Sequence, residues 1–118
     1  MRCAGAAGRG RRRLRGDGDI VGSLYTRAVV GLCAIQVGDT ERALRIAASY
    51  TAEREQFGRP IGQFQAIQHK LADIYTDLQA ARLLTYQTVW HTEQGNLDPK
   101  LGSAAKLFCS EAYMRGAM

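Results

Sequence analysis

Residues 66–94 read AIQHKLADIYTDLQAARLLTYQTVWHTEQ, and apolar or small positions recur through this stretch at alternating steps of four and three. The positions that keep this step are Ile67, Leu71, Ile74, Leu78, Ala81, Thr85 and Thr88. Such steps return to one side of a helix with 3.6 residues per turn, and the near-heptad spacing suits shallow antiparallel packing on another helix. Leu83, Leu84 and Val89 widen the stripe, which indicates burial on two sides. The stretch therefore predicts a long helix of an all-α bundle.

A second long helix is predicted upstream, over residues 20–53. Its apolar positions are Leu24, Ala28, Leu32 and Ile35, followed by Leu44, Ala47 and Ala48. Gly31 and Gly38 interrupt this pattern, and glycine is unfavourable inside a helix unless a neighbouring helix or ligand approaches closely. Asp39-Thr40 after Gly38 is also compatible with a break and a new N-cap. One long helix and two shorter ones both remain open on the sequence.

A third helix is predicted from residue 99 onward. Gly95-Asn96 is typical of a helix C-terminus, and Asp98-Pro99 is typical of the next N-terminus, with aspartate as N-cap and proline at the first helical position. The apolar stripe of this helix is Leu101, Ala104, Ala105, Phe108 and Ala112. No alternating strand pattern is present. The fold class we expect is all-α, an incomplete antiparallel up-and-down bundle with about three of four helices.

The first nineteen residues differ in composition from the rest of the chain. They hold six arginines against Asp17 and Asp19, a balance of +4, whereas residues 20–118 hold ten basic and nine acidic residues, a balance of +1. With almost no large apolar groups, residues 1–19 are expected to be a disordered Arg/Gly-rich tail, and residues 20–118 a truncated helical bundle. Arginine runs also bind phosphate backbones. Nucleic acid is nevertheless not the partner we expect, because no aromatic side chain interleaves with these arginines to stack on bases.

Little else in the composition indicates chemistry. The three cysteines, Cys3, Cys33 and Cys109, form no metal-ligand spacing, and we read Cys33 and Cys109 as small hydrophobic core residues. Their unpaired state favours a reduced, cytoplasmic location. No catalytic residue or metal ligand is predicted, because no nucleophile, phosphate-binding or metalloprotease motif occurs. We also find no apolar run that approaches the length of a membrane span.

The segment between the first two helices, residues 54–65, reads REQFGRPIGQFQ. Two glycines and a proline within five positions make it a loop, yet it carries Phe57, Ile61 and Phe64. Large apolar side chains in a loop must dock onto something, since together they would otherwise leave an exposed apolar patch. On the residues alone, we expect the three to close the end of the bundle and Arg54 to pair with an acid.

The wider stretch from Tyr50 to Asp73 resembles the hallmark segment of acyl-CoA dehydrogenases, in which an Arg-x-Gln-Phe-Gly-x-Pro-Ile run joins two long helices of the C-terminal bundle. Weaker similarity extends from about Leu24 to the end of the chain. The resemblance implies contact with FAD held by a neighbouring subunit or partner chain. Arg54 would meet the pyrophosphate and Gln56 would hydrogen-bond, while Phe57 would face the adenosine portion. Phe64 and Gln65 match a further pair that approaches the same cofactor.

The resemblance also implies parts that this chain does not show. Family members are about three times longer, and their second flavin motif and usual catalytic glutamate would lie beyond Met118. In some relatives the base lies on the first helix of this domain, where Arg27-Ala28-Val29-Val30 offers no carboxylate. We therefore expect a fragment that is inactive alone, has acyl-CoA dehydrogenase subunits as partners, and meets acyl-CoA only in a complete assembly. The alternative is a non-catalytic helical interaction module that pairs with a full-length relative or another partner chain.

Overall fold

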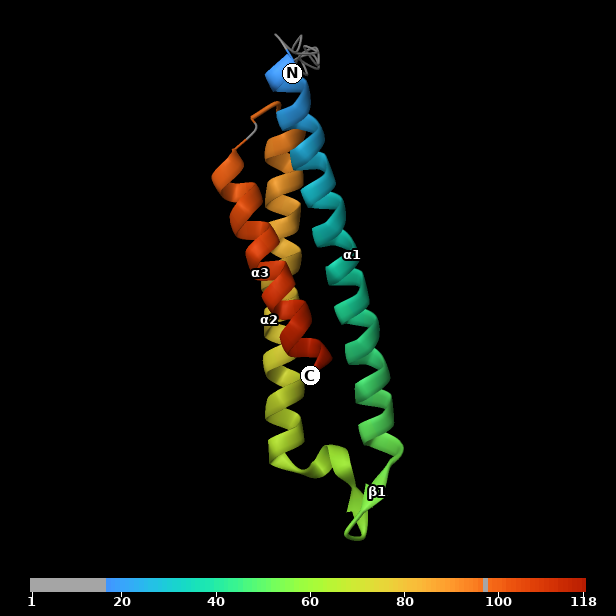
Figure 1. Ribbon diagram of the computed structural model, residues 1–118. Coiled ribbons are helices and arrows are strands. Elements are labelled where there is room, and N and C mark those ends of the chain that lie inside the picture. The colour runs from blue at the N-terminus through green and yellow to red at the C-terminus, as the bar shows by residue number, and fades with distance from the viewer. Residues whose placement is uncertain (1–16, 97) are drawn as a thin grey trace, which may run out of the picture.

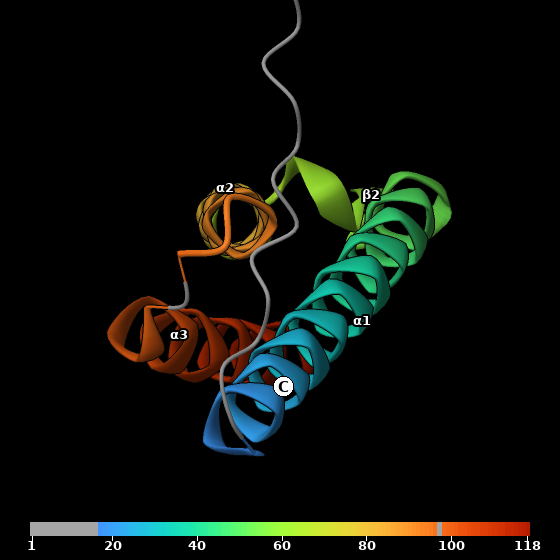
Figure 2. The ribbon, with the colours of Figure 1, turned by 90° about the horizontal axis from the view of Figure 1, so that it is seen from above.

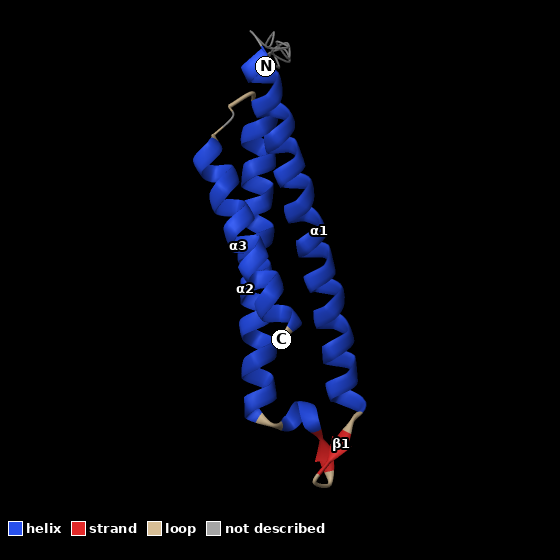
Figure 3. Ribbon diagram, viewed as in Figure 1, coloured by secondary structure: helices blue, strands red, loops and turns tan. Residues whose placement is uncertain are grey.

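The structure, a computed structural model, describes residues 17–96 and 98–118. Three helices account for most of this range: α1 (Asp17–Glu53), α2 (Gln65–Glu93) and α3 (Pro99–Ala117). Two strands of two residues, β1 (Glu55–Gln56) and β2 (Arg59–Pro60), and a 3-10 turn, η1 (Ile61–Gln63), connect α1 to α2 (Figures 1 and 3). The all-α expectation is confirmed.

The helices run down, up and down again in Figure 1, and α3 lies against both others. Seen along the bundle, the three helices occupy the corners of a triangle, with α1 inclined to α2 (Figure 2). The two long helices diverge toward the β1–β2 end, and α3 stops partway along them (Figure 1). At that point a side chain on Gly116 would meet Thr40 of α1 at 3.3 Å and Ile74 of α2 at 3.5 Å.

The core lies in the half of the bundle where all three helices meet. Apart from Leu78, its buried apolar residues are small: Val29, Cys33, Ala81, Ala105, Cys109 and Ala112. The stripe predicted on α2 faces this core, since Leu78, Ala81, Thr85 and Thr88 are buried. Ile67, Leu71 and Ile74, nearer the diverging end, are only half-buried. The stripe is thus confirmed in position, and its burial decreases where the helices separate.

Buried threonines take the place of larger apolar residues in this core. The hydroxyls of Thr40, Thr85 and Thr88 each donate to the carbonyl four residues earlier, at 2.8 Å. A hydroxyl that is satisfied by its own helix requires no partner across the interface. The threonines therefore supply methyl groups to the packing without leaving a buried polar group unpaired.

The helix ends follow the chemistry of their residues. Asp98 caps α3, its carboxylate accepting from the Lys100 amide at 2.9 Å. α2 ends in a Schellman arrangement, in which the amides of Gly95 (φ 72°) and Asn96 donate to the carbonyls of Thr92 and His91. Both ends were predicted from the sequence.

Ion pairs connect the helices outside the core. Glu41 of α1 accepts from Arg82 of α2 at 2.6 Å and from Arg45, one turn along α1, at 2.7 Å. Asp77 of α2 accepts from Arg115 of α3 at 2.8 Å. Pairs with this much solvent exposure are worth about 0.2–1 kcal/mol each, so they help to fix the register of the helices more than the stability.

α1 differs from the sequence expectation in which side faces the core. The predicted stripe points outward, with Leu24, Leu32 and Ile35 exposed to 63%, 50% and 61%. The side of α1 that packs on α2 and α3 is instead the one with Thr26, Val29, Cys33 and Thr40. α1 has two apolar sides, and periodicity alone does not say which one meets the helices of the same chain.

Gly31 and Gly38 do not break α1, and neither lies at a close contact with another described part of the chain. α1 is continuous through Gly38-Asp39-Thr40, so the option of two shorter helices is excluded. A side chain added at Gly31 or Gly38 would meet nothing within 4 Å, so no described part of this chain makes the expected close approach. Both glycines are exposed.

The start of α1 and its hydropathy bear on two expectations from the sequence. α1 begins at Asp17, three residues before the predicted start, and the expected disordered tail otherwise falls on residues 1–16, outside the described range. The segment Ile20–Glu53 contains a window of mean hydropathy 1.5, long and apolar enough by length and composition to cross a membrane. This average tolerates charged residues such as Arg27, so it does not contradict the expectation that no uninterrupted apolar run approaches the length of a membrane span. A bundle helix covered on two sides has the same composition.

Leu78→Ala tests the position of the core. Leu78 is 2% exposed, so its truncation should lower the free energy of unfolding by about 2–5 kcal/mol through lost burial and a residual cavity. Leu83→Ala, on the same helix but 68% exposed, is the matched control and should change it by less than about 0.5 kcal/mol. Chemical denaturation followed by circular dichroism measures both, and equal losses would show that α2 is rotated from the orientation described.

Cys33 provides a test by pH. Burial raises the pKa of the Cys33 thiol from 9.0 to about 11, and the adjacent Cys109 adds to the rise. Between these values the unfolded state loses a proton that the folded state keeps, so the stabilising effect is complete below about pH 9 and lost by about pH 11. The free energy of unfolding should fall across this window with a slope approaching about 1.4 kcal/mol per pH unit. Cys33→Ala should show a shallower slope, and parallel slopes would place the thiol in contact with solvent.

Candidate functional site

The loop between α1 and α2 is a tight hairpin that projects from the diverging end of the bundle (Figures 1 and 3). β1 and β2 are antiparallel, with Glu55 opposite Pro60 and Gln56 opposite Arg59. The two turn residues, Phe57 and Gly58, have φ angles of 56° and 78°. Positive φ at both central residues is the pattern of a type I′ turn, whose twist matches that of the strands it joins.

Phe57 is the unusual residue of this turn. A side chain other than glycine, asparagine or aspartate is uncommon in the left-handed region, and the conformation costs on the order of 1 kcal/mol. The Phe57 side chain is also 93% exposed. The turn therefore holds a large apolar group in solvent at a conformational cost, a combination that is found at binding sites. Phe57 does not plug the bundle end, contrary to the expectation from the residues alone.

Phe64, at the N-cap of α2, contacts both an aromatic and a basic side chain of the hairpin. Its ring centroid lies 6.2 Å from that of Phe57, edge to face at 83°. The guanidinium carbon of Arg59 lies 4.1 Å from the same centroid. Phe64 and Ile61 are half-buried against the bundle. Of the three apolar loop residues, two dock as expected and one remains in solvent.

Arg54 lies directly after α1 and fixes the base of the hairpin through its backbone. Its amide donates to the Tyr50 carbonyl at 2.9 Å, and its carbonyl accepts from the Ile61 amide at 2.8 Å. Its guanidinium is exposed, and within residues 17–96 and 98–118 it forms no ion pair with a carboxylate. The acid partner expected for Arg54 is not found in this part of the chain.

The two glutamines complete the predicted set. The Gln56 amide nitrogen donates to the Glu55 carbonyl at 2.7 Å, and Gln65 is the exposed first residue of α2. The structure places all five predicted residues at one end of the molecule: Arg54, Gln56, Phe57, Phe64 and Gln65. Their role in binding a cofactor stays a prediction.

The loop is anchored to the bundle at Gly62. A side chain there would lie 3.0 Å from the Thr51 carbonyl oxygen, which is tighter than an ordinary contact, so glycine lets η1 lie this close to the end of α1 without a shift of the backbone. The Gln68 amide nitrogen also donates to the Gly62 carbonyl at 3.0 Å. On the sequence, Gly62 was read only as one of the two glycines that make the loop, and Arg59 was given no role. The signal for Gly62 was its position between two apolar residues that both dock, whereas nothing in the pattern singled out Arg59.

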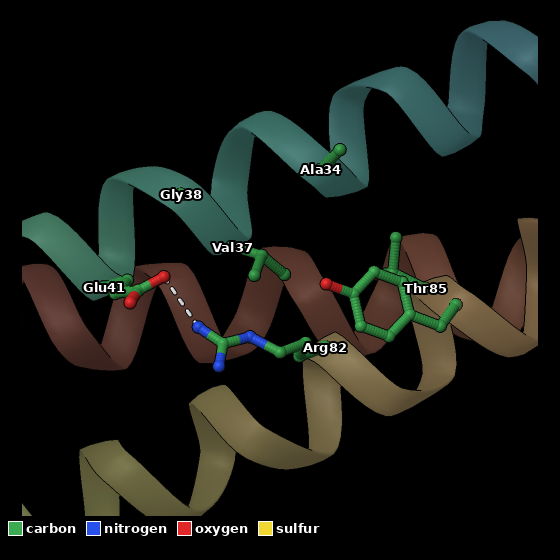
Figure 4. Close-up of a pocket in the computed structure, with 7 residues that line it drawn as sticks. Ala34, Val37, Gly38, Glu41, Arg82 and Thr85 are labelled. Atoms are coloured by element: carbon green, nitrogen blue, oxygen red, sulfur yellow. Dashed lines mark hydrogen bonds and ion pairs between the residues drawn. The ribbon is translucent and has the colours of Figure 1, made fainter.

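A hollow lies between α1 and α2 (Figure 4). It has a volume of about 390 Å³ and is lined by Ala34, Val37, Gly38, Glu41, Arg82, Thr85 and Tyr86. Arg82 reaches across it from α2 to Glu41 on α1 (Figure 4). The two charged groups neutralise each other, so the hollow presents no unpaired charge to recognise a ligand.

Other candidate groups have structural roles. The Asp77 carboxylate accepts from Arg115. Cys33 and Cys109 are buried free thiols, as predicted. Among residues 17–96 and 98–118, no group of three or more His, Cys, Asp or Glu side chains is arranged to hold a metal ion. The hairpin end is therefore the best candidate site.

Comparison with known proteins identifies the family of this chain. The family model "Acyl-CoA dehydrogenase, C-terminal domain" matches residues 22–118. Isovaleryl-CoA dehydrogenase, mitochondrial, of Oryza sativa subsp. japonica is 44% identical over 87 residues, covering 74% of this chain and 21% of that protein. A 3-(aryl)acrylate reductase of Clostridium sporogenes is 41% identical over 86 residues, covering 73% and 23%. The structure of a glutaryl-coenzyme A dehydrogenase in complex with glutaryl-CoA aligns with a TM-score of 0.81 at 35% identity, covering 86% and 26%.

The chain belongs to the acyl-CoA dehydrogenase family and corresponds to its C-terminal helical domain. It spans about a quarter of the length of the relatives it matches. These relatives differ in the reactions that their names describe, so membership alone does not fix a substrate.

Phe57→Asn tests the strain in the turn. Asn-Gly is a preferred pair for type I′ turns, and Phe57 has little burial to lose. The substitution should raise the free energy of unfolding by about 0.5–1 kcal/mol. Phe57→Leu, which keeps an apolar side chain in the same backbone region, should give no such gain. Denaturant titration checks both variants, and a loss of stability in Phe57→Asn would show that the contact with Phe64 outweighs the strain.

Proposed function

We propose that this chain forms one wall of an FAD site in an acyl-CoA dehydrogenase assembly, with the hairpin reaching the cofactor held by a neighbouring subunit or partner chain. The observation that supports this best is the exposed, strained Phe57, three residues after Arg54, whose guanidinium forms no ion pair within the described residues. A site that binds an adenine dinucleotide needs both a cation for the phosphates and an apolar surface for the ring system. The hairpin offers the two within a few residues of each other.

The donor set fits this cofactor. Arg54 carries a planar fork of N–H donors suited to a pyrophosphate, and no described carboxylate competes for it. Phe57 provides an exposed ring for the adenosine portion, supported by the edge contact with Phe64. Gln56 and Gln65 add amide groups on the same end of the bundle. When bound, FAD would supply the hydride acceptor for α,β-dehydrogenation of an acyl-CoA thioester.

The proton-transfer part of that reaction is not assigned to this chain. The stretch that matches the base of some relatives, residues 27–30, holds no carboxylate. We propose that this chain binds and orients FAD, and that the catalytic base comes from another part of the assembly.

A second candidate function is a non-catalytic helical module that binds another chain. The outward side of α1, with exposed Leu24, Leu32 and Ile35, favours it. An exposed apolar strip of this kind is a docking surface in either case, so it does not distinguish a working subunit from a structural partner.

Flavin retention distinguishes the two functions. The chain is purified alone and co-expressed with a full-length family member, and the visible absorption spectrum of bound flavin is recorded for each sample. Arg54→Ala should raise the Kd of the co-purified complex for FAD by about ten- to a hundredfold, because charge-assisted hydrogen bonds to the pyrophosphate are lost. Phe57→Ala should also weaken retention.

The matched control for Arg54 is Arg42→Ala, which removes an exposed arginine from α1 at a distance from the hairpin. It should leave flavin content unchanged. Colourless samples in every case, with the partner still bound, would reject the cofactor site and leave the interaction module as the function.

A further inference from the structure

The hairpin tip is held against the bundle by a stack of three side chains. Phe64 extends from the start of α2, Arg59 lies over its ring at 4.1 Å, and Phe57 meets it edge to face at 6.2 Å. A guanidinium is attracted to the negative face of an aromatic ring, and two rings attract each other where the edge of one meets the face of the other. Phe64 is thus the common partner of the two residues that flank Gly58.

The remaining contacts of the hairpin hold its base and not its tip. The Arg54–Ile61 backbone bond and the approach of Gly62 to Thr51 fix the points where the loop leaves and rejoins the helices. Between these points each strand has only two residues, and so short a ladder is marginal without side-chain packing. The turn also carries the positive φ of Phe57, which favours other conformations.

Arg59 has no competing partner that would draw it away from the ring. Within the described parts of the chain it pairs with no carboxylate, and Gln56 is the residue opposite it in the ladder. A flat guanidinium stacks on a ring more effectively than an ammonium group does, so arginine is better suited than lysine to this position.

We propose that Arg59 is a positioning residue of the hairpin site: by stacking on Phe64 it fixes the tip, and with it the orientation of Phe57 and the distance of Phe57 from Arg54. What the tip binds rests on the proposed function. The stacking and its effect on the hairpin do not depend on it. Arg59 acts through Phe64 and needs no contact with the cofactor.

Hydrogen–deuterium exchange tests this independently of flavin. In the co-purified assembly, the peptide covering residues 54–64 should exchange about two- to fivefold faster in Arg59→Gln than in the wild-type chain, the loss expected for one exposed cation–π contact. Phe64→Leu should have a similar effect, and the double variant should add little to either single one because both remove the same contact. Arg59→Lys should recover part of the protection. Peptides from α3 should not change.

Flavin affinity is the second measurement. Arg59→Gln should raise the Kd for FAD about two- to fivefold, with the same non-additivity toward Phe64→Leu. Arg42→Gln removes an equal charge elsewhere on the surface and should change neither readout.

The combined outcomes separate the two proposals. Unchanged exchange in Arg59→Gln overturns the positioning role, even where affinity falls, since a fall in affinity alone would mean direct contact between Arg59 and the phosphates. Faster exchange in an assembly that retains no flavin, wild type included, supports the positioning role and rejects the cofactor site.

Discussion

The small side chains at the meeting point of the three helices are the constraint on which the structure depends. Cys33, Ala81, Ala105 and Cys109 are almost fully buried and allow close helix–helix approach. Larger residues there would separate the helices, because packed interiors tolerate little extra volume. The buried threonines also allow this close approach, because their hydroxyls hydrogen-bond to their own helices and need no partner across the interface. Tight packing is therefore concentrated in the half of the bundle that α3 covers, and α1 and α2 diverge beyond it.

That divergence determines how the hairpin is built. The Arg54–Phe64 segment cannot rely on the shared core, and it is held by local devices: Gly62 against Thr51 at its base and the Phe64 stack at its tip. Segments with few buried contacts open at a lower free energy than the core does. The residues proposed to bind the cofactor therefore lie on the least constrained part of the molecule, so the contacts that orient them matter for that proposal.

The sequence predicted the features that depend on local chemistry. The α2 stripe, the Asp98 cap and the Gly95 terminus follow from period and capping rules, and the structure confirms them. The inward side of α1 could not be chosen, because Leu24-Ala28-Leu32-Ile35 is as periodic as the side that packs. The Glu41–Arg82 pair joins residues 41 positions apart in sequence, and it depends on how α1 and α2 are rotated relative to each other. The type I′ turn was hidden because Phe-Gly lacks the asparagine or aspartate that marks such turns.

α1 connects the two surfaces that matter for function. Its outer strip of Leu24, Leu32 and Ile35 is apolar and accompanied by the exposed Gly31 and Gly38, at which a neighbour could approach the backbone closely. An exposed apolar strip of this kind is typical of an interaction surface, so the composition of α1 fits the proposed contact with a partner chain. Arg54 follows the last residue of α1 directly. A partner chain that packs on the outer strip would therefore also fix the position of Arg54 and the hairpin. Assembly would in this way be coupled to the geometry of the proposed cofactor site.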